Sequence, residues 1–234
     1  WLRTEQQVYA CLKGSFMPRC LGQVEDAEEP VLFLEDLSGA HWPPPWEAGQ
    51  VEAVLRALEE LWRRELPFEV PRLEDQRAEM QSWPKVREAP EQFLALGLCD
   101  AQWLEAALPA LESAESRVRL DGDDLLHLDV RGDNLCFSQG RVLLLDWNWV
   151  CRGNGKLDVG AWLPSLHREG GPPPEAVLPG EPEVAAMLAG YWAWRAGQPA
   201  PTPGSRLREM QKYQLVAALG WAARELGLPP PAGS

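Results

Sequence analysis

The sequence predicts an α+β protein in which a small mixed region at the N-terminus precedes a mainly helical body. Four stretches with apolar residues at helical spacing predict long helices, at residues 47–65, 101–114, 183–196 and 205–226. Two short apolar runs, 135–137 and 142–145, flank the turn Ser-Gln-Gly-Arg and predict a β-hairpin within the helical body. Strands and helices do not alternate as they do in βαβ units, so we do not expect a parallel sheet.

The N-terminal region is predicted to contain one helix and one strand. Residues 3–13 have an apolar side and predict a short helix. The apolar run at 31–34 ends at the acidic pair Glu35-Asp36 and predicts a strand. The segment 41–46 is rich in proline and tryptophan, so we expect it to be a rigid connector.

The helices of the body have predictable ends. Residues 75–97 predict helical structure with a break at one of the internal prolines, and residues 157–167 predict a further helix. Asp100 is placed to cap the helix that follows it. Ser205 and Gly227 are placed as the N-cap and the C-terminal stop of the last helix.

Composition narrows the choice of partners and surroundings. The 234 residues carry 35 acidic and 22 basic side chains, which gives a formal net charge of -13. Such a chain is ill suited to nucleic acid or an anionic membrane surface but is compatible with a cationic ligand. No apolar run has the length of a membrane span, and the N-terminus lacks a basic-then-apolar signal pattern. The five cysteines are scattered without a CxxC pair, which predicts free thiols in the cytoplasm.

One stretch has the residues needed for phosphoryl transfer. Asp129 lies in a loop that enters the predicted hairpin, Asn134 ends this loop, and Asp146 follows the second strand. A hairpin returns the chain to its starting point, so Asn134 and Asp146 can face each other. Their oxygens form a hard-ligand set suited to Mg²⁺, and Asp129 can orient an attacking hydroxyl and accept its proton.

The motif resembles that of a known enzyme family. The pattern His127-x-Asp129-x-x-x-x-Asn134, followed by a hairpin and Asp146-Trp, resembles the catalytic loop and metal-binding segment of the aminoglycoside phosphotransferase and choline kinase-like family, which is related to the protein kinases. This resemblance implies a protein-kinase-like fold with the catalytic hairpin embedded in a mainly helical C-lobe, residues 39–234. Residues 1–38 would be a small, truncated N-lobe ending in the strand whose backbone holds adenine.

The resemblance also implies a role for each matching residue. Asp129 would be the catalytic base, and Asn134 and Asp146 would bind Mg²⁺. The backbone of Glu35 and Leu37 would contact the purine of ATP or GTP. Supporting roles fall to the following four residues: Glu5 as the partner of a phosphate-binding lysine, His127 and Asp158 as braces of the catalytic loop, and Arg131 as a phosphate contact or a further brace.

Two functions remain open from the sequence. The first is a small-molecule kinase that transfers the γ-phosphate of a nucleoside triphosphate to a hydroxyl of an aminoglycoside-like or other metabolite. The alternative is a pseudokinase-type module that binds a nucleotide or a partner without transfer. The family's Gly-rich hairpin and lysine strand do not precede Glu5, which favours the alternative, whereas the intact set at residues 129, 134 and 146 favours the enzyme.

The tryptophans and one acidic stretch are two further candidates for ligand binding. The 12 tryptophans could form an aromatic cage for a cationic acceptor, but tryptophan at helical spacing is more often part of the core. The acidic stretch 121–124 lacks the later bidentate glutamate of a calcium loop and predicts a solvated turn. A zinc or calcium protein is therefore the less favoured rival class.

Overall fold

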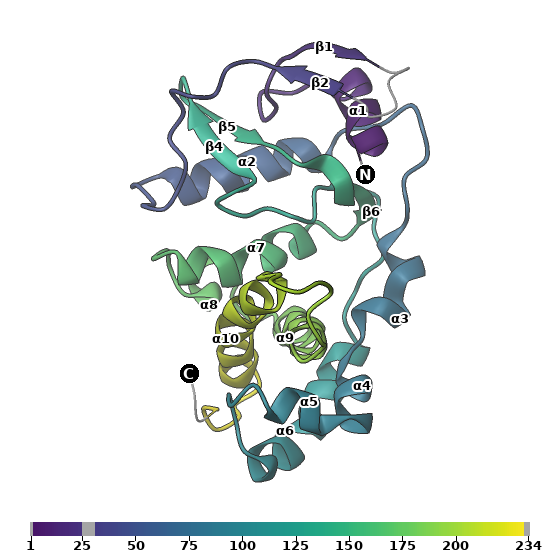
Figure 1. Ribbon diagram of the computed structural model, residues 1–234, viewed down its shortest axis with the longest axis vertical. Coiled ribbons are helices and arrows are strands. Elements are labelled where there is room, and N and C mark those ends of the chain that lie inside the picture. The colour runs from purple at the N-terminus through teal and green to yellow at the C-terminus, as the bar shows by residue number, and fades with distance from the viewer. Residues whose placement is uncertain (1, 25–30, 232–234) are drawn as a thin grey trace. The chain divides into compact units, whose positions relative to one another are not determined.

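The computed structural model describes residues 2–24 and 31–231 (Figure 1). The chain divides into two compact units, one formed by Trp1–Leu73 with Asp121–Trp162 and the other by Glu74–Leu120 with Leu163–Ser234. Mixed helix and short strands confirm the α+β class. The expected division into lobes at residues 1–38 and 39–234 stays a prediction.

In the first unit, helix α1 (Leu2–Cys11) packs on a two-stranded antiparallel sheet of β1 (Cys20–Val24) and β2 (Val31–Leu34). The Gln6 side chain fastens the helix to the sheet, because its amide nitrogen donates to the carbonyls of Val24 at 3.1 Å and Val31 at 3.2 Å. The predicted strand has the observed bounds of β2, whereas β1 was not predicted. Its polar residues and its glycine hid the strand pattern.

The same unit contains helix α2 (Gln50–Trp62) and two further strand pairs. Val54, Leu58 and Leu61 form the buried stripe of α2, as its helical periodicity predicts. Strands β3 (Asp124–Leu126) and β6 (Cys151–Gly153) pair in antiparallel fashion.

The predicted hairpin is confirmed as β4 (Leu135–Ser138) and β5 (Arg141–Leu144), with Leu135 opposite Leu144. Its two turn residues, Gln139 and Gly140, have φ angles of 51° and 74°. Two successive positive φ values match the right-handed twist of the flanking strands and give a tight return. A short 3₁₀ turn, η2 (Trp147–Trp149), follows the hairpin.

The second unit is helical. Its helices are α3 (Arg77–Met80), α4 (Trp83–Glu88), α5 (Pro90–Leu94), α6 (Ala101–Ser116), α8 (Pro174–Val177), α9 (Pro182–Ala196) and α10 (Leu207–Glu225). The 3₁₀ turn η1 (Leu73–Gln76) and helix α7 (Lys156–Arg168) each span a boundary between the units. Helix α9 packs against both α10 and α6, and small residues on α9, including Gly190, allow this close approach. A Cβ at Gly190 would lie only 2.5 Å from Glu115 Oε1.

Helix ends in this unit follow the sequence with two corrections. Residues 75–97 break more than once, because Pro84 and Pro90 both lie in the first turns of separate helices, where no backbone N–H is needed. The N-cap assigned to Ser205 is wrong by one position: Arg206 is the cap residue, and the Ser205 hydroxyl accepts from the Leu207 N–H at 3.3 Å. Asp100 caps α6 as predicted, accepting from the Trp103 N–H at 2.7 Å.

Among the described residues, no helix combines the length and the apolar character that a membrane crossing requires.

Candidate active site

The loop between β3 and β4 is built around a buried histidine. His127 is fully buried, and its Nε2 lies 2.8 Å from the Leu145 carbonyl. Its Nδ1 accepts from the Asp129 N–H at 3.3 Å, so the ring proton is on Nε2. Burial lowers the pKa of His127 to about 4. The imidazole is therefore neutral at physiological pH and joins the start of the loop to the end of β5.

Asp158, on α7, holds the same loop from the other side. Its buried carboxylate accepts from the backbone N–H groups of His127 at 3.1 Å and Leu128 at 2.6 Å, and from Trp62 Nε1 at 3.2 Å. Leu128 has a φ of 60°, which is unusual for a branched side chain. Two hydrogen bonds from consecutive amides to one carboxylate stabilise this backbone conformation, although burial raises the pKa of Asp158 to about 6.

Asp129 and Asn134 are in direct contact within the loop. The Asn134 amide nitrogen donates to the Asp129 carbonyl at 3.0 Å and to the carboxylate Oδ2 at 2.8 Å. The amide nitrogen is thus committed to Asp129, and the amide oxygen of Asn134 remains to bind another group. Burial raises the pKa of Asp129 to about 6, against the opposing effect of Arg131 and with a further increase from Asp146.

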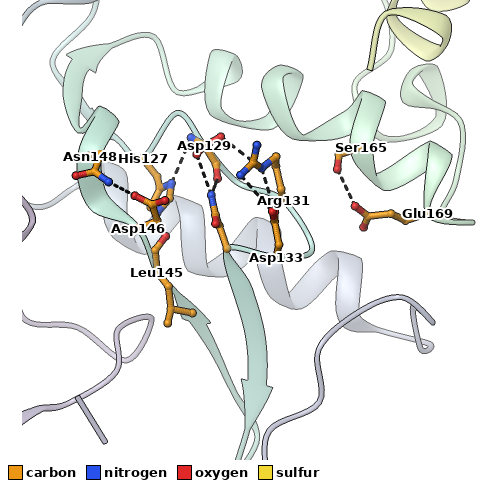
Figure 2. A network of polar contacts seen from close by, with 10 residues as sticks. His127, Asp129, Arg131, Asp133, Leu145, Asp146, Asn148, Ser165 and Glu169 are labelled. Atoms are coloured by element: carbon orange, nitrogen blue, oxygen red, sulfur yellow. Dashed lines mark hydrogen bonds and ion pairs between the residues drawn. The ribbon is translucent and has the colours of Figure 1, made fainter. Parts of the chain in front are cut away.

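Arg131 joins two carboxylates of the loop, as Figure 2 shows. Its Nε lies 3.6 Å from Asp129 Oδ1 and 3.0 Å from Asp133 Oδ1, and its Nη2 lies 3.3 Å from Asp133 Oδ2. The guanidinium therefore fixes the orientation of Asp129 while leaving that carboxylate partly exposed.

Asp146 lies where the hairpin brings it back to Asn134. The Leu145 N–H donates to the Asn134 carbonyl at 2.8 Å, one residue before Asp146. Asp146 itself has φ 61° and ψ 70°, a left-handed conformation at the end of β5. The Asn148 amide nitrogen hydrogen-bonds Asp146 Oδ1 (Figure 2). The hairpin thus brings together the two residues predicted to bind a metal.

Glu5, on α1, reaches this turn as well. Burial and the charge of Asp146 raise the pKa of Glu5, and hydrogen bonds from the backbone of Trp147 and Asp146 oppose the increase. The Trp147 ring lies edge-on to His127 with ring centroids 4.6 Å apart. Helix α1 therefore supports the Asp146 turn directly, a contact that the sequence did not predict for Glu5.

Glu35 and Leu37 lie at the end of β2. The Glu35 carboxylate accepts from the Arg19 N–H and from Arg141 Nη2, both at 2.9 Å. Hydrogen bonds from Arg19 and Arg141 lower the pKa of Glu35 to about 2. The Leu37 carbonyl accepts from the Ala40 N–H at 3.0 Å. Because Arg141 begins β5, Glu35 is linked to the β4–β5 hairpin. Among the described residues, neither Glu35 nor Leu37 hydrogen-bonds Asp129.

The sequence missed three contributors to this site. Trp62 hydrogen-bonds Asp158 from 96 positions away, so no local pattern signals it. Asp133 lies within the motif, and its charge was the available signal. Asn148 hydrogen-bonds Asp146, a contact that the sequence did not predict. Its side-chain oxygen is buried without a partner in the described part of the chain.

The donor set fits a hard divalent cation. Asp146 offers a carboxylate and Asn134 an amide oxygen, and Mg²⁺ prefers such ligands while keeping water and phosphate oxygens. The described residues contain no cluster of three His, Cys, Asp or Glu side chains arranged to hold a metal. The rival prediction of a zinc or calcium protein therefore gains no support from these residues.

No family model and no curated protein sequence matches this chain. Several solved structures do match this chain. An aminoglycoside phosphotransferase, APH(4)-Ia, in a ternary complex with AMP-PNP and hygromycin B, has a TM-score of 0.60 at 14% identity, covering 99% of this chain and 83% of its own. A choline/ethanolamine kinase family protein from Mesorhizobium loti has a TM-score of 0.56 at 15% identity, covering 96% and 82%.

A second complex of APH(4)-Ia, with ADP and hygromycin B, has a TM-score of 0.55 at 13% identity and covers 99% of this chain and 83% of its own. Likeness at this level of identity establishes the fold. The expectation drawn from the motif is confirmed to that extent: this chain has the protein-kinase-like fold of the aminoglycoside phosphotransferases and the choline kinase-like proteins.

Proposed function

We propose that this protein is a small-molecule kinase that transfers the γ-phosphate of ATP or GTP to a hydroxyl group. The observation that carries the proposal is the meeting of Asp129, Asn134 and Asp146 at the entrance and exit of one hairpin. The fold adds weight, because solved proteins of this fold are described as phosphotransferases and kinases of small molecules.

Asp129 is the proposed catalytic base. Asn134 binds one of its carboxylate oxygens and Arg131 lies beside the other, so the group is oriented before an acceptor arrives. In transfer, Asp129 orients the acceptor hydroxyl in line with the γ-phosphorus and accepts its proton as the new P–O bond forms. The bond between the γ-phosphorus and the bridging oxygen breaks, and the nucleoside diphosphate leaves. The braces His127 and Asp158 keep the loop in the conformation that this alignment needs.

Asn134 and Asp146 are the proposed holders of Mg²⁺, which when bound neutralises charge on the triphosphate. Glu5 and Asn148 hold the turn that carries Asp146. Glu5 was expected to pair with a lysine. The contacts of the described residues instead support a role in fixing this turn.

The nucleotide base is proposed to bind at the end of β2, through the backbone of Glu35 and Leu37. The acceptor is a small hydroxyl-bearing molecule, which can be cationic in view of the net charge of -13. Hygromycin B in one solved neighbour and the choline/ethanolamine name of another support an amine-bearing acceptor such as an aminoglycoside or an amino alcohol. All five cysteines are free, which supports a cytoplasmic location.

A transfer assay tests the proposal. The protein is incubated with γ-labelled ATP or GTP and Mg²⁺ against a panel of aminoglycosides, amino alcohols and sugars, and labelled product is separated and counted. EDTA and the Asp146→Ala variant should both abolish labelling. Nucleotide binding without transfer to any acceptor in a broad panel would instead favour the pseudokinase-type module.

A further inference from the structure

The β1–β2 sheet ends in an irregular hydrogen-bond pair. In an antiparallel ladder every second facing pair exchanges two bonds, each N–H donating to the opposite carbonyl. At the end of this ladder the Glu35 N–H donates to the Arg19 carbonyl at 2.9 Å. The Arg19 N–H does not return the bond to the Glu35 carbonyl but donates to Glu35 Oε1, also at 2.9 Å. The Glu35 side chain thus accepts the Arg19 N–H that would otherwise bond to the Glu35 carbonyl.

This diversion leaves two backbone groups open. Within the described residues, nothing donates to the Glu35 carbonyl, and the Leu37 N–H has no acceptor. The backbone between them is shaped by Asp36, whose carboxylate accepts from the N–H and the hydroxyl of Ser38 at 2.9 Å and 3.0 Å. An open acceptor is therefore followed two residues later by an open donor.

The Glu35 carboxylate is held firmly enough to maintain this state. Besides the Arg19 N–H, it accepts from Arg19 Nε at 3.1 Å and from Arg141 Nη2 at 2.9 Å, and its side chain is only 10% exposed. Two guanidinium groups keep the carboxylate ionised and oriented, because charge-assisted hydrogen bonds are stronger than neutral ones. A shorter side chain, without an oxygen at this position, would release the Arg19 N–H to the open carbonyl.

We propose that Glu35 is a positioning residue for the nucleotide base and that it makes the site select adenine over guanine; the inference rests on the proposed function. Adenine presents an amino donor beside a ring-nitrogen acceptor, which complements a carbonyl followed by an N–H. Guanine presents a carbonyl acceptor and a ring N–H donor at the same edge, which is the reverse order. The side chain of Glu35 acts through its own main-chain carbonyl and does not touch the base.

Binding of AMP-PNP and GMP-PNP, measured by calorimetry with Mg²⁺, tests the inference. Wild-type protein should bind AMP-PNP at least about tenfold more tightly, the discrimination that one mismatched hydrogen bond gives. Glu35→Ala should weaken AMP-PNP binding about tenfold while changing GMP-PNP binding less, so that the ratio of the two affinities falls. Glu35→Gln retains an oxygen for the Arg19 N–H and should keep a ratio near that of the wild type.

Arg141→Met is the matched control. It removes one ion pair from Glu35 but leaves the Arg19 N–H bond, so the ratio should change by less than about threefold, although urea unfolding should show reduced stability. If Arg141→Met lowers the ratio of the two affinities as much as Glu35→Ala does, Glu35 acts only through the stability of the protein, and the inference is overturned. Equal binding of both analogues by the wild type, or unchanged binding by Glu35→Ala, also overturns it. A wild type that binds neither analogue removes the proposed function itself, and the inference with it.

Discussion

Replacing His127 with glutamine tests the physical account of the loop between β3 and β4. A glutamine amide can still donate to the Leu145 carbonyl, but it loses the ring nitrogen that accepts the Asp129 N–H and the edge-on contact with Trp147. An unsatisfied buried N–H costs about 1–3 kcal/mol, and a lost aromatic contact costs about 0.5–1.5 kcal/mol. At pH 7.5 we therefore expect the free energy of unfolding of His127→Gln to be lower by about 3 kcal/mol.

The pH dependence of this difference is the sharper prediction. The pKa of His127 is about 4 when folded, against 6.5 for an unperturbed imidazole. Below pH 6.5 the unfolded chain binds a proton that the folded chain does not, so the wild type loses stability as the pH falls toward 4. This loss amounts to about 2 kcal/mol by pH 5 and about 3 kcal/mol in full, and His127→Gln does not share it. The gap between the two proteins should therefore shrink from about 3 kcal/mol at pH 7.5 to about 1 kcal/mol at pH 5.

Urea unfolding followed by circular dichroism at pH 5, 6 and 7.5 measures the gap directly. Titrating groups that do not contact residue 127 contribute equally to both proteins, so the comparison removes their effect. A gap that stays constant over this range would refute the reasoning, because His127 would then carry the same charge in the folded and unfolded states.

Three further changes test the second unit. Asp100→Ala removes the cap bond to the Trp103 N–H and should cost about 1 kcal/mol of stability in thermal melts, whereas Asp100→Ser should cost much less. Glu115 is buried and burial raises its pKa to about 7, so its contribution to stability is full below pH 4.5 and is lost as the pH rises through 7. Wild type should lose about 3 kcal/mol from this group over that window, and urea unfolding of Glu115→Gln should show no such loss. Gly190→Ala places a Cβ 2.7 Å from the Trp83 ring and should cost about 1–3 kcal/mol by urea unfolding; an unchanged midpoint would show that α9 can shift to accept it.

The elements with strong local signals were predictable. The periodic apolar residues of α2 predicted that helix, and two apolar runs around a turn with glycine predicted the β4–β5 hairpin. The position of Asp100 before a helical stretch predicted its role as an N-cap. The closeness of the proposed site residues was predictable because they flank one hairpin. Local chain reversal alone brings Asn134 to Asp146.

Contacts made at long range were not predictable. Nothing in the sequence near Trp62 indicates that its indole donates to Asp158, because the pairing depends on how α2 packs. The same holds for the side chain of Glu35, for which the sequence predicted only a backbone role. Its bonds to Arg19 and Arg141 join residues that are 16 and 106 positions away in the sequence. Sequence patterns specify secondary structure, but tertiary packing decides which polar groups are satisfied.

The central claim is that Asp129 activates the acceptor in a phosphoryl transfer, and the Asp129→Asn variant tests it most directly. Its rate of labelled-product formation from γ-labelled ATP is measured beside its affinity for AMP-PNP. We predict a rate at least about 100-fold below the wild type, with nucleotide affinity within about threefold. Turnover within about tenfold of the wild type, on the acceptor that the wild type phosphorylates, would contradict the assignment of Asp129 as the base.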